Sequence, residues 1–64
     1  MSNQIIIKTR SKFHTFEIAK TIAHSAYMED WDYRITKSDF TIIIETEHRD
    51  MDDWLMDEFR DHVC

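Results

Sequence analysis

The sequence predicts a small α+β domain in which the elements follow one another in the order βαββα. Three observations support this prediction: consecutive isoleucines at 5–7 and 42–44, apolar residues at helical spacing over 16–27, and a final segment, 50–63, whose apolar and acidic residues separate onto two faces. With 64 residues, the chain is long enough for a single domain, residues 1–64, with a small core.

The first predicted element is a strand over Gln4–Thr9. Its centre consists of Ile5, Ile6 and Ile7, and β-branched side chains of this kind favour extended backbone. An unbroken apolar run of this length is typical of a strand that is covered on both faces. We therefore expect this strand to belong to a sheet and to contribute to the core.

A helix is predicted to follow, with Ser11 or Thr15 as its N-cap. Apolar residues recur at intervals of three and four and so define one face that we expect to be buried. These residues are Phe16, Ala19, Ile22, Ala23, Ala26 and Tyr27. The three alanines would let the helix lie close to a sheet.

Two further strands are predicted to form a hairpin. Trp31, Tyr33 and Ile35 alternate with polar residues, as in a half-buried strand. A short polar turn at 37–39 leads into a strand over Phe40–Glu45.

The last predicted element is an amphipathic helix with Asp50 as its N-cap. Acids at its start, including Asp52, would lie at the positive end of the helix macrodipole. Met51, Trp54, Leu55, Phe59 and Val63 are expected on the buried face, and Asp53, Asp57, Glu58 and Asp61 on the exposed one.

Together these elements predict a three-stranded sheet with both helices on one face and the third strand in the centre. This is a split-βαβ, ferredoxin-like arrangement that lacks the last strand. The missing strand would leave the outer edge of the first strand unpaired, along Ile5, Ile6 and Ile7. Because an open edge is a template for another strand, we expect a homodimer to form there.

Charge and composition restrict the function. The formal net charge is -5, and it comes entirely from residues 50–64, which carry six acids and one base, because residues 1–49 carry seven of each. Such a segment attracts cationic surfaces and repels nucleic acid and anionic membranes. The chain contains no glycine, which excludes glycine-rich phosphate loops, dinucleotide-binding fingerprints and nucleophile elbows.

We expect neither a metal site nor an enzyme active site, and we expect no bound cofactor. The candidate metal ligands are His14, His24, His48, His62 and Cys64, but none of them has the spacing of a zinc site. The acids of the last helix would be solvated, and Cys64 stands in acidic surroundings that disfavour a thiolate. A single cysteine indicates a reducing compartment, here the cytoplasm, with an intermolecular disulfide as the alternative.

One alternative function is a small nucleic-acid-binding module. Lys8, Arg10 and Lys12 form a basic cluster, and a stacking platform could come from Trp31, Tyr33 and Phe40. The net charge argues against this function, because phosphate contacts dominate affinity for nucleic acid. A second alternative is a structural subunit that docks through its open strand edge.

The leading hypothesis is a non-enzymatic protein that binds a basic surface on a partner protein. The anionic groups would be Asp53, Asp57, Glu58 and Asp61, with Trp54 and Met56 as apolar anchors beside them. The alternative role for these acids is to keep a small protein soluble.

In its small size, its acidity and its lack of catalytic motifs, the chain resembles the short proteins that phages make to disable host machinery, including anti-CRISPR proteins. This resemblance implies a stoichiometric inhibitor that occludes a basic groove. Over Ser25–Asp30, and in its βαββα order, the chain also resembles the small partner proteins of His-Xaa-Ser peptide-maturation systems.

Overall fold

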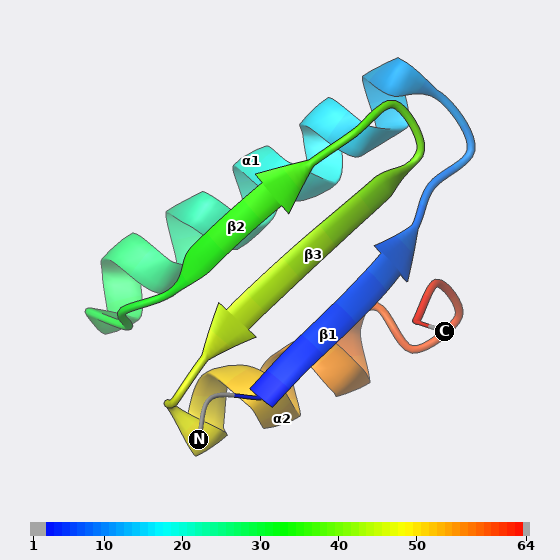
Figure 1. The fold of residues 1–64 in the computed structure, drawn as a ribbon. Coiled ribbons are helices and arrows are strands. Elements are labelled where there is room, and N and C mark those ends of the chain that lie inside the picture. Colours follow the sequence, from blue (N-terminus) through cyan, green and yellow to red (C-terminus); the bar gives the residue numbers. More distant parts are fainter. Residues whose placement is uncertain (1–2, 64) are drawn as a thin grey trace.

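The computed structural model describes residues 3–63 and confirms the predicted order of elements (Figure 1). Its elements are β1 (Asn3–Lys8), α1 (Lys12–Glu29), β2 (Arg34–Lys37), β3 (Thr41–Thr46) and α2 (Arg49–Glu58). Cys64 lies outside the described residues. The structure therefore does not test the roles considered for it above, which are those of a metal ligand, a reactive thiolate and a partner in an intermolecular disulfide.

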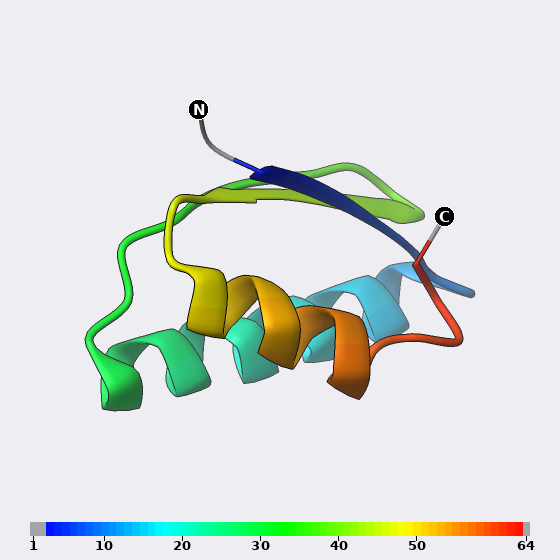
Figure 2. The same cartoon turned by 90° about the horizontal axis from the view of Figure 1, so that it is seen from below.

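The three strands form one antiparallel sheet in the order β1-β3-β2, so the third strand is central as predicted. Ile44 of β3 is paired with Ile5 on one side and with Ile35 on the other. Both helices cover the same face of the sheet, as Figure 2 shows from the side. The α+β fold class is therefore confirmed.

The isoleucine runs are covered on one face rather than on both. Ile5 and Ile7 of β1, and Ile42 and Ile44 of β3, point toward the helices and are at most 5% exposed. Ile6 and Ile43 lie on the other face and are only partly buried. The expectation of a doubly covered strand is wrong, because two helices in a chain this short cover only one side.

α1 begins and ends with local hydrogen bonds that the sequence supplies. The hydroxyl of Ser11, the N-cap, accepts a bond from the N–H of His14 over 3.0 Å, which confirms one of the two predicted caps. Thr15, the other candidate, is buried, and its hydroxyl donates to the carbonyl oxygen of Asp39. At the other end Asp30 adopts a left-handed conformation with φ 58°, a role that glycine usually takes.

The buried face of α1 agrees with the prediction at Ala19, Ile22 and Ala26 and differs from it elsewhere. The buried residues are Thr15, Ile18, Ala19, Ile22 and Ala26. Phe16 is 59% exposed and Tyr27 83% exposed, and Ala23 is exposed as well. α1 is apolar on two sides, and the sheet packs against the side with the smaller residues because the helix can approach it more closely there.

α2 begins two residues earlier than predicted and ends sooner. His48 is the N-cap and makes no side-chain capping bond, so Asp50, the predicted cap, lies inside the first turn. Met51 and Leu55 are fully buried, as predicted. The helix ends at Glu58, and Val63, which was expected on its buried face, lies beyond it.

The segment after α2 turns back onto the sheet. The carbonyl oxygen of Phe59 accepts bonds from the N–H groups of His62 and Val63, and Val63 then forms an isolated antiparallel bridge with Ile7. The expectation that the outer edge of β1 is unpaired is therefore wrong at its C-terminal end. The local pattern of the sequence could not show this, because the contact joins residues far apart in the chain.

Within residues 3–63, neither helix has the length and apolar character that crossing a membrane requires.

Candidate functional site

The carboxylates of the predicted recognition surface point away from the core. Met51 and Leu55 anchor one side of α2 to the sheet and α1. All four predicted anionic groups, Asp53, Asp57, Glu58 and Asp61, are exposed, and we call this group the acidic face. The prediction of a single helical stripe is wrong for Asp61, because α2 ends at Glu58 and Asp61 lies in the turn that follows.

No base within residues 3–63 neutralises the acidic face. None of its four carboxylates forms a salt bridge with a described residue, whereas Lys12 and Asp39 lie 3.9 Å apart elsewhere on the surface. Unpaired carboxylates on α2 and on the turn that follows it create a negative field that favours a cationic partner.

The acidic face is unfavourable for α2 itself. Asp57 and Glu58 lie in the last turn of the helix, where the macrodipole favours cations, and that turn contains no base. Asp53 and Asp57 are four residues apart, a spacing at which like charges repel. By contrast, Asp50 and Asp52 lie in the first turn, where acids stabilise the helix.

The two predicted apolar anchors differ in availability. Trp54 packs between Trp31, with ring centroids 6.0 Å apart, and Phe59, which meets it edge-on at 5.7 Å. Trp54 therefore closes one end of the core and offers only part of its ring to a partner. Met56 is 47% exposed and lies next to Asp57 in sequence.

The aromatic side chains of the nucleic-acid alternative lie in different parts of the fold. Lys8 and Arg10 are exposed, but Lys12 lies within salt-bridge distance of Asp39. Trp31 and Tyr33 are partly buried against the core on the helix side of the sheet. Phe40, 52% exposed, lies in the turn between β2 and β3, so the three aromatic rings form no shared stacking platform.

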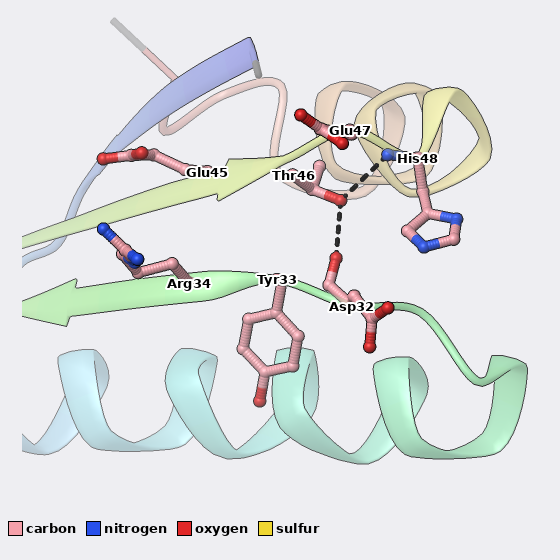
Figure 3. A pocket seen from close by; sticks show the side chains of 7 residues that line it. All are labelled: Asp32, Tyr33, Arg34, Glu45, Thr46, Glu47 and His48. Carbon is pink, nitrogen blue, oxygen red and sulfur yellow. Dashed lines mark hydrogen bonds between the residues drawn. The ribbon is translucent and has the colours of Figure 1, made fainter. Parts of the chain in front are cut away.

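A surface hollow of about 400 Å³ lies where β2 begins and β3 ends (Figure 3). At its floor the buried Thr46 hydroxyl donates to the Asp32 carbonyl oxygen over 2.8 Å and accepts from the His48 N–H over 3.1 Å. Both hydrogen-bonding functions of this hydroxyl are thus used to join the chain before β2 to the start of α2. This arrangement gives Thr46 a structural role.

The histidines do not converge on a metal site in the part of the chain that the structure describes. His14 and His62 are in edge-to-face contact with ring centroids 5.1 Å apart. Nδ1 of His14 accepts a hydrogen bond from the N–H of Arg10, so that nitrogen is already engaged. Within residues 3–63, no three histidine, aspartate, glutamate or cysteine side chains are placed to hold an ion.

Sequence reasoning missed an exposed apolar stripe on α1. Phe13 is 72% exposed and Phe16 59%, and Tyr27 continues the same side of the helix with 83% of its surface exposed. Together with Lys20 and Ala23, these residues follow intervals of three and four, which place them on one face. This periodicity was visible in the sequence, but a second stripe with the same spacing competed with it.

The comparisons with known proteins leave these surfaces as the basis for assigning a function. No protein-family model matches the chain, and no curated protein or solved structure is significantly similar to it. The fold and its exposed surfaces define a small two-layer α+β domain with exposed acids on α2 and on the turn that follows it.

Proposed function

We propose that this protein is a non-enzymatic binding protein whose acidic face seats in a basic groove on a partner protein. The observation that carries the proposal is the exposure of Asp53, Asp57, Glu58 and Asp61 with no ion pair to any described base. A groove rich in Arg and Lys would supply the positive charges with which these carboxylates are not paired among the described residues.

The arrangement of the acids favours recognition over mere solubility. Acids spread over the surface would serve solubility without opposing a helix. Here Asp57 and Glu58 occupy the end of α2 at which acids destabilise it. Their presence at this end of α2, in a domain with a small core, is explained if they make contacts with another molecule.

The proposed mechanism is steric and electrostatic. A groove that normally holds nucleic-acid phosphates would instead hold carboxylates mounted on a helix whose other side is fixed by Met51 and Leu55. Met56 would add apolar contact beside them. The protein would then act as a stoichiometric inhibitor, in the reducing compartment that its single cysteine indicates.

The test compares two double variants with the same charge. Asp57→Lys/Glu58→Lys and Glu17→Lys/Glu29→Lys each change the formal net charge from -5 to -1, but the second pair lies on the exposed surface of α1. The immobilised wild-type protein and both variants are exposed to lysate of the native host, and bound proteins are eluted with heparin, a soluble polyanion.

We expect a heparin-eluted protein to be retained by the wild type and by the α1 variant, and lost from the α2 variant. Circular dichroism should show the same fold for all three. Equal retention by both variants would contradict the proposal, because binding would then follow net charge rather than the acidic face.

A further inference from the structure

The sheet has a second edge, β2, which lies beside the exposed apolar stripe of α1. The strand order leaves β2 with a neighbour on one side only among residues 3–63. Viewed onto the sheet, α1 runs along β2 and extends outward past that edge (Figure 1). A hollow of about 360 Å³ lies between them, which we call the β2 groove. It is lined by Phe16, Lys20 and Ala23 on α1 and by Tyr33, Ile35 and Lys37.

The hydrogen-bond alternation shows which backbone groups face outward at β2. Ser38 donates its N–H to Thr41 of the neighbouring strand, so the even-numbered residues of β2 bond to β3. The N–H and C=O groups of Ile35 and Lys37 therefore point to the outer edge. The side chains of these same two residues line the β2 groove. An added strand would thus meet free backbone groups and an apolar floor together.

The charges around the β2 groove indicate what kind of strand fits. Lys37 is at the C-terminal end of β2, with Lys20 beside it in the groove and Lys12 in the adjoining hollow. All three side chains are exposed, and only Lys12 of the three is within salt-bridge distance of an acid among the described residues, Asp39 at 3.9 Å. The occupant should therefore place carboxylates at this end.

A second copy of this chain does not meet that requirement at this edge. β2 contains Arg34 and Lys37 and no acid, so pairing two β2 strands would bring four cations together along a short seam. Like charges facing each other disfavour such pairing, and a cationic residue on an edge strand is a known protection against it. The same cations attract an acidic strand.

We propose that the β2 groove binds an extended segment of another protein as a fourth strand, with apolar side chains facing α1 and acids beside Lys20 and Lys37. Backbone bonds to Ile35 and Lys37 would supply affinity, and Phe16 and Ala23 would contact the alternate apolar side chains. This binding uses a surface distinct from the acidic face and does not rest on the function proposed above.

The probe is a fluorescein-labelled peptide that alternates threonine and valine and ends in three acidic residues. Its control peptide ends in three lysines instead. We expect the acidic peptide to bind and the basic one to bind about tenfold more weakly or not at all. In the complex, the amide protons of Ile35 and Lys37 should exchange more slowly with solvent, because strand addition gives them hydrogen-bond acceptors.

Matched protein variants locate the site. Lys20→Glu/Lys37→Glu should weaken peptide binding about tenfold, whereas Lys8→Glu/Arg10→Glu, with the same charge change elsewhere, should leave it within about twofold. Phe16→Ser should also weaken binding, and it will not unfold the domain because Phe16 is 59% exposed. Asp57→Lys/Glu58→Lys should bind the peptide as the wild type does, which separates this test from that of the acidic face.

Three results would overturn the proposal. The first is no saturable binding of the acidic peptide up to about 1 mM. The second is binding without slower exchange at Ile35 and Lys37, which would indicate a docked helix or side-chain contacts alone. The third is protection of those amides from exchange in the absence of peptide, with the protection increasing as the protein concentration rises. That result would indicate pairing between copies of the chain.

Discussion

The backbone N–H of Lys8 donates to the carbonyl oxygen of His62 over 2.8 Å and fastens the end of the chain to the outer edge of β1. With the bridge between Ile7 and Val63, this bond gives β1 a partner on its outer side at one end. The homodimer predicted from the sequence would have to form along the rest of this edge or displace the segment after α2.

Releasing that segment should promote self-association. Val63→Pro removes the N–H that donates to Phe59 over 3.1 Å, so the turn that holds the segment against β1 weakens. We expect light scattering to show a larger concentration-dependent increase in mass for this variant than for the wild type or for Asp61→Ala. Identical masses for all three proteins over the same concentrations would show that the β1 edge does not drive association.

Two substitutions with the same charge change should have opposite effects on the stability of α2, because the helix macrodipole favours acids at its start and bases at its end. Asp57→Lys replaces an acid in the last turn of α2 by a base and should raise the melting temperature by about 2–4 °C. Asp50→Lys makes the same replacement in the first turn and should lower it by a similar amount. Thermal melts followed by circular dichroism measure both. A lower melting temperature for both variants would show that the acids in the last turn do not destabilise α2.

The anchoring of α2 depends on its fully buried side chains. Leu55→Ala should reduce the free energy of unfolding by about 2–5 kcal/mol, because it leaves a cavity beneath the helix. Met56→Ala, one residue along and 47% exposed, should change it by less than about 0.5 kcal/mol. Urea denaturation distinguishes the two, and similar losses would contradict the orientation of α2.

Thr46 is expected to contribute more to the free energy of unfolding than other threonines of the sheet. Thr46→Val leaves the Asp32 carbonyl and the His48 N–H without the partner that now joins them, and should cost about 1–3 kcal/mol of unfolding free energy. Thr36→Val, at an exposed position of β2, should have little effect. If both variants unfold at the same urea concentration as the wild type, the junction between β2 and α2 does not depend on this hydroxyl.

The sequence allowed the fold class to be predicted because its signals are local. The isoleucine runs determine two strands, and Ser11 and the spacing of Ile22 and Ala26 determine α1. The end of α2 was predicted wrongly because the chain has no glycine or proline there to mark it. The bridge between Ile7 and Val63 depends on a contact across the whole chain, which a local pattern does not contain.

The exposure of the four acids was predicted from the sequence, but the arrangement of the surfaces around them was not. The exposure of Asp53 and Asp57 follows from helical spacing once Leu55 is buried. The side of α1 that faces the sheet could not be chosen by spacing alone, because the stripe through Phe16 and Tyr27 fits the helical period as well as the stripe through Ile22 does. Packing against the sheet decides between them, and only the folded chain shows the result.

The role of the acidic face in binding is measured by a calorimetric titration with the partner recovered from the lysate, at low and at physiological salt. We expect the wild type and Glu17→Lys/Glu29→Lys to bind with the same affinity and higher salt to weaken both. We expect Asp57→Lys/Glu58→Lys to give no measurable binding at either salt concentration. Undiminished binding by the Asp57→Lys/Glu58→Lys protein would show that the carboxylates of α2 are not the recognition surface.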